Sequence, residues 1–198
     1  MRATIDGAGG LPVSVKTRIG YHQSVVEEWV GHLLEARPAV ITLHLRTAKE
    51  MSKVDARWDE ITKAVPLVKG TGTLLLGNGD VRDLEHADRL VEETGIDGVM
   101  FGRAIFGYPW LFNRERSRDS ISLDEKLEAM LTHARLYDEI FSGHKSFLLM
   151  RKHLLAYANG FRGAREFRLM LQQVNSVADV EAAVAQFRNH YRQAGIGR

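Results

Sequence analysis

Residues 73–103, TLLLGNGDVRDLEHADRLVEETGIDGVMFGR, contain the pattern that decides the fold. An apolar run at Thr73–Gly77 precedes a stretch with helical spacing of apolar residues at Arg82–Thr94, and a second apolar run follows at Gly98–Phe101. Both runs end in glycine-containing turns. Short strands that alternate with helices of about a dozen residues indicate parallel βα units.

The same alternation extends toward the N-terminus. Strands are predicted at Leu11–Lys16 and Ala39–Leu45, helices at His22–Ala36 and Trp58–Val68, and Met1–Gly10 is interpreted as the tail of a helix. Four parallel strands cannot close a barrel of this kind, which needs eight. The sequence therefore predicts an α/β fold that contains the second half, strands five to eight, of a (β/α)8 TIM barrel. Its first and last strands would be unpaired edges.

After Pro109 the pattern changes to helices only. Ser122 followed by Glu125 is a capping-box signature at the start of the first of them. The polar stretch Asn113–Ser120 predicts a boundary between a partial-barrel domain at residues 1–113 and an all-α helical bundle at residues 120–198. The predicted helices are Leu123–Phe141, Lys145–Ala158, Ala164–Val174 and Val177–Ala194.

The composition excludes several classes of protein. The 198 residues are 44% hydrophobic and carry a formal net charge of +2, which is too apolar for a disordered chain. The absence of cysteine excludes a disulfide scaffold, a cysteine zinc site and an iron–sulfur cluster within this sequence. No apolar stretch is long enough to span a membrane, and no secretory signal is present. We expect a cytoplasmic protein with no membrane partner and no metal.

Charge is unevenly distributed along the chain. Residues 1–110 carry a net charge of −2 and residues 111–198 a net charge of +4. Within Lys145–Arg168 six basic residues stand against one acidic residue. A basic surface of this kind can bind a polyanion such as RNA, although a solvated helix face would have the same composition.

Polar groups follow each predicted strand. The turns at 77–80 and 102–103 offer backbone N–H groups to a phosphate, and Arg103 would add a charge-assisted contact. Lys16 and Arg18 share one face of the first strand, and His44 and Arg46 repeat the arrangement at the end of the second. The sequence therefore predicts a ligand site at the carboxyl ends of the strands, where (β/α)8 barrels place their active sites.

Several segments resemble one known family. LPVSVKTRIGY (11–21), ITLHLRTAKEMSK (41–53), LLGNGDV (75–81) and GVMFGRAIFGYPWLF (98–112) are similar, in this order, to the second half of a tRNA-dihydrouridine synthase. FLLMRKHLLAYANGFRGAREFR (147–168) resembles the C-terminal RNA-binding domain of that family. The resemblance implies an FMN-binding barrel followed by a helical bundle. It also implies reduction of selected tRNA uridines to 5,6-dihydrouridine, with NADPH supplying electrons through FMN, and a monomeric full-length enzyme.

The resemblance also implies roles for individual residues. Lys16 would contact the flavin ring near N1 and O2, where a positive charge stabilises the anionic reduced flavin, and His44 would face its pyrimidine edge. Arg46 would lie near the substrate uridine. The implied FMN-binding set is Lys16, His44, Asn78, Gly79, Asp80, Gly102 and Arg103. Lys152 and His153 would meet tRNA phosphates, and charge alone adds Arg151, Arg162 and Arg165.

The sequence departs from the family pattern in three respects. The family's general acid is a cysteine on a loop after strand four, and this chain has none. Leu45 stands where the family usually has glycine, and Ala48 where it often has arginine. We therefore expect a fragment of the enzyme that is inactive alone. Two alternatives remain open: another FMN- or phosphate-binding barrel oxidoreductase, such as a dihydroorotate dehydrogenase relative, and a non-catalytic RNA-binding remnant.

Overall fold

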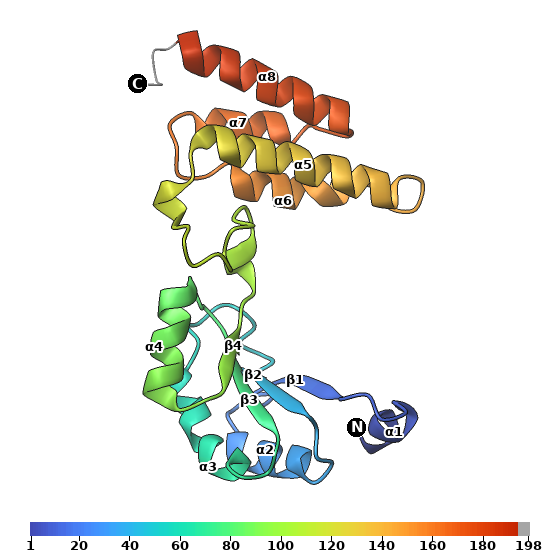
Figure 1. Ribbon diagram of the computed structural model, residues 1–198, viewed down its shortest axis with the longest axis vertical. Helices are drawn as coiled ribbons and strands as arrows, with labels where there is room; N and C mark the ends of the chain where they lie inside the picture. The colour runs from blue at the N-terminus through green and yellow to red at the C-terminus, as the bar shows by residue number, and fades with distance from the viewer. Residues whose placement is uncertain (194–198) are drawn as a thin grey trace. The chain divides into compact units, whose positions relative to one another are not determined.

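The computed structural model describes residues 1–193 and divides into two compact units, Met1–Ala104 and Ile105–Arg198. The first unit contains a β-sheet with helices, and the second is helical (Figure 1). The division falls before the polar stretch 113–120 in which the sequence predicts a domain boundary. The reason is packing within the second unit, where a Cβ on Gly107 would lie 2.2 Å from the carbonyl oxygen of Ala156.

The first unit contains a four-stranded sheet in which every pair of neighbours is parallel. The strands follow one another in chain order, so each connection crosses to the adjacent strand. All four predicted strands form, with ends that differ from the prediction by up to three residues. The strands are β1 (Ser14–Arg18), β2 (Val40–His44), β3 (Leu74–Asn78) and β4 (Gly98–Met100).

One face of the sheet is covered by helices. Ile41, Leu43 and Leu75 point to this face and join a core with Val30 of α2 and Ile61 of η1, all of them buried. Burial of this apolar surface is the main force that holds the helices on the sheet. The helical elements of the unit are α1 (Arg2–Gly7), α2 (Val26–Leu34), η1 (Trp58–Lys63), α3 (Val65–Val68) and α4 (Leu84–Thr94) (Figure 1).

The predicted single helix at Trp58–Val68 is divided into η1, a 3-10 helix, and α3. Pro66 lies in the first turn of α3. Proline has no N–H to donate and its ring clashes with the carbonyl four residues earlier, so an α-helix cannot run through this position without a break. Ile61, Ala64 and Val68 of this segment are buried, and Pro66 determines the backbone that carries them.

The second unit is built on a core of buried side chains from all of its long helices, including Met130, Leu154 and Phe167. Ser122 and Glu125 form the predicted capping box at the start of α5. The predicted helix at Lys145–Ala158 begins as a 3-10 turn capped by Ser146. The elements are η3 (Arg118–Ser120), α5 (Leu123–Phe141), η4 (Phe147–Met150), α6 (Arg151–Tyr157), α7 (Ala164–Leu171) and α8 (Val177–Gln193), and η2 (Arg103–Ile105) precedes them. Among residues 1–193, no helix combines the length and apolar character needed to cross a membrane.

Candidate functional site

The sheet register aligns polar side chains at one edge of the first unit. Arg18 pairs with His44, His44 with Asn78, and Asn78 with Met100. Each of these residues is the last of its strand. Partners in a parallel register project from the same face of the sheet. That face is opposite to the one that carries Ile41, Leu43 and Leu75. Lys16, two residues before Arg18, lies on it as well.

Asp80 connects the turns that follow β3 and β4. Arg46 Nη2 donates a hydrogen bond to Asp80 Oδ2, which also accepts from the backbone N–H of Ala56 at 3.0 Å. Arg103 Nη2 donates to Asp80 Oδ1 at 2.9 Å. Burial alone would raise the pKa of Asp80, but the bonds from Ala56 and Arg46 and the charges of Arg46 and Arg103 outweigh it and lower that pKa. The carboxylate is therefore ionised and held between two arginines.

Arg46 lies in the interior of this cluster, with a side chain only 4% exposed. Its Nε donates to the carbonyl of Val54 at 2.5 Å, and its Nη1 lies 3.3 Å from His44 Nε2. The guanidinium thus joins the end of β2, the loop that follows it and the turn after β3. The resemblance implies a position for Arg46 near the substrate uridine, and in the structure its guanidinium contacts His44 and Asp80.

His44 and Lys16 lie in a positively charged environment. Burial and then the charges of Arg18, Lys16 and Arg46 lower the pKa of His44 to about 4, although Asp80 raises it. Partial desolvation and the charge of Arg18 also lower the pKa of Lys16. The histidine ring is therefore neutral near pH 7, and the surrounding cations outnumber the one carboxylate in contact with them.

The turn after β3 requires glycine at position 79. Gly79 has a φ of +133°, and a Cβ there would lie 2.7 Å from Ala56 Cβ. Its carbonyl accepts a hydrogen bond from Trp58 Nε1 at 3.0 Å. The side chain of Asn78 donates to the carbonyl of Met100 at 2.7 Å, which joins the ends of β3 and β4. Gly102 has open space around its Cα.

Four hydrogen bonds of the loop between β2 and η1 could not be identified from the sequence. Glu50 accepts hydrogen bonds from the backbone N–H of Thr47 at 2.7 Å and from Arg57 Nη2 at 2.8 Å. Arg18 Nη1 donates to the carbonyls of Thr47 and Met51 at 2.8 and 3.0 Å. These bonds join residues that are three to 33 positions apart, so no short spacing marks them. They hold the loop that carries Ala56 and Trp58 to the site.

The strand ends are suited to an anionic or acceptor-rich ligand. Lys16 is exposed, and Arg103 is 69% exposed although it contacts Asp80. Gly102 leaves room for a ligand beside a backbone N–H group. No group of three His, Asp or Glu side chains within residues 1–193 is placed to hold a metal ion. A flavin mononucleotide, with its phosphate and its carbonyl-rich ring, fits this set of donors.

The basic residues predicted in the second unit divide into two groups. Arg151 donates to the carbonyl of Val174 at 2.8 Å and to Asn175 Oδ1 at 2.9 Å, so it holds the connection between α7 and α8. His153 is partly buried, with its ring centroid 5.3 Å from that of Phe106. Three exposed cations have no partner within residues 1–193. They are Lys152, Arg162 and Arg165.

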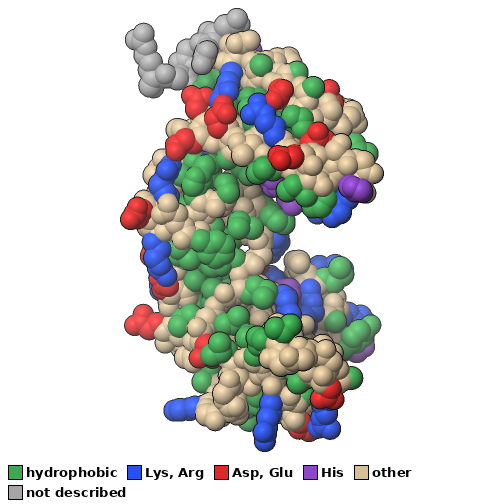
Figure 2. All heavy atoms as spheres, turned by 45° about the vertical axis from the view of Figure 1, so that its right-hand side comes forward, with side chains coloured by type: hydrophobic (Ala, Val, Ile, Leu, Met, Phe, Trp, Pro, Cys, Tyr) green, Lys and Arg blue, Asp and Glu red, His purple; other side chains and the backbone are tan. Residues whose placement is uncertain are grey.

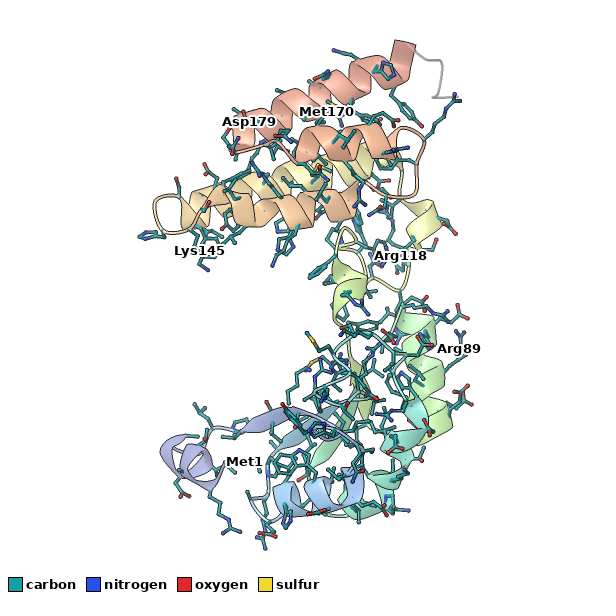
Figure 3. The ribbon with its side chains drawn as sticks, turned by 180° about the vertical axis from the view of Figure 1, so that it is seen from behind. Met1, Arg89, Arg118, Lys145, Met170 and Asp179 are labelled. Atoms are coloured by element: carbon teal, nitrogen blue, oxygen red, sulfur yellow. The ribbon has the colours of Figure 1, made fainter. Side chains whose placement is uncertain are left out.

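One face of the second unit carries charged side chains of both signs. On the face seen in Figure 2, basic and acidic side chains of this unit alternate. Lys145 lies in the turn between α5 and η4, with its ammonium 4.1 Å from the centroid of the Phe141 ring (Figure 3). Net charge alone therefore does not define an RNA surface here, and the positions of individual unpartnered cations matter more.

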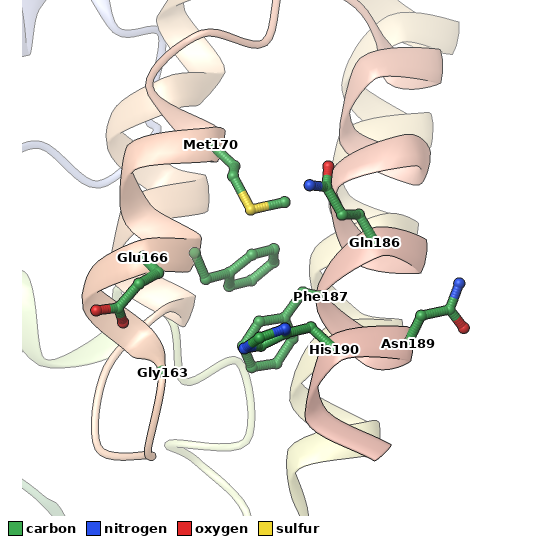
Figure 4. Close-up of a pocket in the computed structure, with 8 residues that line it drawn as sticks. Gly163, Glu166, Met170, Gln186, Phe187, Asn189 and His190 are labelled. Atoms are coloured by element: carbon green, nitrogen blue, oxygen red, sulfur yellow. The ribbon is translucent and has the colours of Figure 1, made fainter. Parts of the chain in front are cut away.

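The second unit also contains a groove of about 740 Å³ between α7 and α8 (Figure 4). Phe167, Met170 and Phe187 form its apolar wall, and Glu166 and His190 lie at its rim. None of the residues predicted from the sequence to bind FMN or tRNA lines it. The groove is thus separate from both predicted sites.

Comparison with known proteins identifies the family. The model of the family described as "Dihydrouridine synthase (Dus)" matches residues 1–192. The chain belongs to the dihydrouridine synthase family. It is 40% identical over 185 residues to a probable tRNA-dihydrouridine synthase of Staphylococcus aureus (strain Mu50), which covers 91% of this chain and 56% of that protein. It is 38% identical over 188 residues to probable tRNA-dihydrouridine synthase 2 of Bacillus subtilis (strain 168), which covers 93% and 57%.

The dihydrouridine synthase resemblance inferred from the motifs is therefore confirmed at the level of the family. The chain spans a little more than half the length of the curated relatives that it matches. The structure brings His44, Arg46, Asp80 and Arg103 into one hydrogen-bonded series, with Lys16 and Asn78 on the same face of the sheet.

Proposed function

We propose that this chain binds FMN at the carboxyl ends of its four strands and binds tRNA through its helical unit, as part of an FMN-dependent tRNA-dihydrouridine synthase. The observation that carries the proposal is the continuous series of hydrogen bonds from His44 through Arg46 and Asp80 to Arg103. It holds groups from three successive strand ends at one edge of the sheet. Cations there exceed carboxylates, which favours a bound phosphate.

The sheet has the features of one half of a (β/α)8 barrel. Its strands are parallel and follow chain order, and α2, η1, α3 and α4 pack on one face. On the other face Leu74 is exposed and Leu76 is only partly buried. We infer that this second face points to the interior of a closed barrel, where strand ends of both halves would surround the flavin.

We assign a separate role to each residue at the strand ends. Lys16 would place its positive charge beside the flavin ring, and Arg103 with the backbone N–H of Gly102 would hold the phosphate. Asn78 and Asp80 keep the turns after β3 and β4 at a fixed separation through their bonds to Met100 and Arg103. Bound FMN would supply the hydride, received from NADPH, that reduces the C5–C6 double bond of a tRNA uridine.

Reduction of the uridine also needs a proton at C5, a general-acid step. The chain contains no cysteine, and we assign no residue of this sequence to that proton. The target base must leave its stack to reach a site at the strand ends. Lys152, Arg162 and Arg165 would hold the phosphate backbone of the tRNA during this step, because each is exposed and has no side-chain partner in the part of the chain that the structure describes.

Flavin titration tests the first half of the proposal. FMN and riboflavin differ only by the phosphate, so the purified chain should bind FMN more tightly. Arg103→Ala should weaken FMN binding by about tenfold and leave riboflavin binding nearly unchanged, since a charge-assisted bond is lost only with the phosphate. Equal affinity for both flavins would contradict the phosphate site. A folded chain that binds neither flavin would contradict the function at the strand ends.

A second candidate function, RNA binding without flavin, is favoured by Lys152, Arg162 and Arg165, which are exposed and have no partner among the described residues. Binding of tRNA that falls steeply with salt, in a chain that binds no FMN, would support it. FMN binding without any tRNA binding would instead support a flavin barrel that acts on a small molecule. The two titrations on one preparation therefore separate all three functions.

A further inference from the structure

The ring of His44 has one nitrogen in contact with the protein. Its Nε2 lies 3.3 Å from Nη1 of Arg46. A guanidinium has five N–H donors and no acceptor, so a hydrogen bond between the two requires an unprotonated Nε2 that accepts. The proton of a neutral ring must then lie on Nδ1.

We propose that Arg46 is a positioning residue that fixes His44 in the Nδ1–H tautomer and so presents a neutral N–H donor to the ligand at the strand ends. The identity of that ligand as a flavin rests on the proposed function. The tautomer itself rests only on the contacts of Arg46. A free histidine side chain in water favours the other tautomer, so the protein must impose this one.

Arg46 is held firmly enough to impose it. The guanidinium is planar, and bonds to Val54 O and Asp80 Oδ2 fix two of its three nitrogens. Its side chain is 4% exposed, so water cannot replace these partners at low cost. With two nitrogens fixed, the plane of the guanidinium and the directions of the two N–H bonds on Nη1 are fixed as well, and His44 Nε2 lies within hydrogen-bond distance of Nη1.

The surrounding charges keep the ring neutral, which leaves the choice of tautomer to Arg46. Arg18, Lys16 and Arg46 are the cations that act on His44, and Asp80 is the carboxylate that opposes them. Burial and these cations lower the pKa of His44 to about 4. Near pH 7 the ring therefore carries one proton, on one nitrogen or the other.

The other nitrogen, Nδ1, is available to a ligand. It has no hydrogen-bond partner within residues 1–193. The fully buried side-chain nitrogens that lack a hydrogen-bond partner in that range are Arg57 Nε and Arg188 Nε, and His44 Nδ1 is not one of them. His44 Nδ1 is thus an accessible donor. A carbonyl oxygen or an unprotonated ring nitrogen of a heterocycle is the acceptor that it would select.

The tautomer can be measured directly by NMR of the ligand-free chain labelled with ¹⁵N-histidine. Long-range ¹H–¹⁵N correlations distinguish protonated from unprotonated ring nitrogens, and the spectrum of His44→Gln assigns the signal. We expect a protonated Nδ1 and an unprotonated Nε2 at about pH 7. A proton on Nε2, or on both nitrogens, would overturn the proposal whatever the chain binds.

Two substitutions test whether Arg46 sets the tautomer. Arg46→Lys keeps the charge but loses the planar fork, and should let the Nε2–H form of His44 appear. Arg89→Lys is the control, because Arg89 bonds Glu85 on α4 at 2.6 Å and belongs to no contact of the strand ends, and it should leave the ring unchanged. Should Arg46→Lys not fold, Asp80→Asn loosens the same guanidinium and should have the same effect. An unchanged His44 ring in a folded variant at either position would overturn the role of Arg46.

Addition of FMN tests the use of the donor. The Nδ1 signal of His44 should shift, and Arg46→Lys should bind FMN about fivefold more weakly than Arg89→Lys, the loss expected for one hydrogen bond. Bound FMN with no shift at Nδ1 would overturn the donor role. Absence of FMN binding would instead contradict the proposed function and leave the tautomer result standing.

Discussion

The strand ends of the first unit and the basic helices of the second unit use cations in opposite ways. At the strand ends Arg46 and Arg103 share one carboxylate, and Arg18 holds two carbonyls of the neighbouring loop. In the helical unit, Lys152 and Arg162 are exposed and unpartnered among the described residues. Residues of the first region depend on one another for their positions. Charges of the second region are independent and should act nearly additively.

The largest difference in stability should be between variants of the two arginines that bind Asp80. Arg46→Ala removes a guanidinium that is only 4% exposed and takes one donor each from Asp80 Oδ2, Val54 O and His44 Nε2, so we expect a loss of about 3 kcal/mol in the free energy of unfolding. Arg103→Ala removes a partner whose side chain is 69% exposed, and the loss should be under about 1 kcal/mol. Urea unfolding measures both. Equal losses would show that the burial of Arg46 does not make its contact with Asp80 more stabilising than that of Arg103.

The next largest effect on stability is expected from alanine substitutions in the two glycine-containing turns. Gly79→Ala places a Cβ 2.7 Å from Ala56 Cβ at a φ of +133°, which should cost about 2 kcal/mol of folding free energy and displace the loop after β2. Gly102→Ala meets no atom within 4 Å and should leave stability unchanged. Thermal unfolding of the two variants provides the comparison. A destabilised Gly102→Ala would show that the turn after β4 is tighter than the structure indicates.

The fold of the first unit could be predicted from the sequence because its strands are buried apolar runs with regular spacing. Thr73–Gly77 and Gly98–Phe101 gave β3 and β4 to within a residue. The division of Trp58–Val68 was missed, because apolar periodicity describes which side chains are buried and not how the backbone passes Pro66. Similarly, the contact of Gly107 with Ala156 depends on two segments about 50 residues apart.

The candidate site was predictable in its location and not in its connections. Parallel strands carry their carboxyl ends to one edge, so Lys16, His44 and Asn78 were expected together, and the register confirms that they share a face. The partners of Asp80 and Glu50 come from loops, where side-chain direction is set by tertiary contacts. Charge composition likewise selected Arg151 for tRNA, although its guanidinium holds Val174 and Asn175.

Salt dependence of tRNA binding should sharpen the distinction within the basic segment. Replacing Lys152, Arg162 and Arg165 together by alanine should reduce the slope of log affinity against log salt by about 2 to 3, because each lost phosphate contact removes about 0.7 to 0.9. Arg151→Ala should lower the melting temperature of the helical unit and change the slope by less than 1. An unchanged slope in the triple variant would exclude these three cations from the RNA surface.

The smallest effect concerns a single carboxylate at the start of α5. Hydrogen bonds from Arg116 and from the backbone and side chain of Ser122 lower the pKa of Glu125 from 4.5 to about 2. A lowered pKa in the folded state contributes stability above the unfolded value, and this contribution disappears as the pH falls from about 4.5 toward 2. The difference in melting temperature between the wild type and Glu125→Gln should therefore shrink over that interval. Glu139→Gln is the control for the loss of one charge. Glu139 lies on the same helix, and its side chain has no hydrogen-bond partner among the described residues. If the Glu125→Gln difference stays constant with pH, the capping box acts through shape and hydrogen bonding, and the ionised carboxylate adds nothing to the stability of the helical unit.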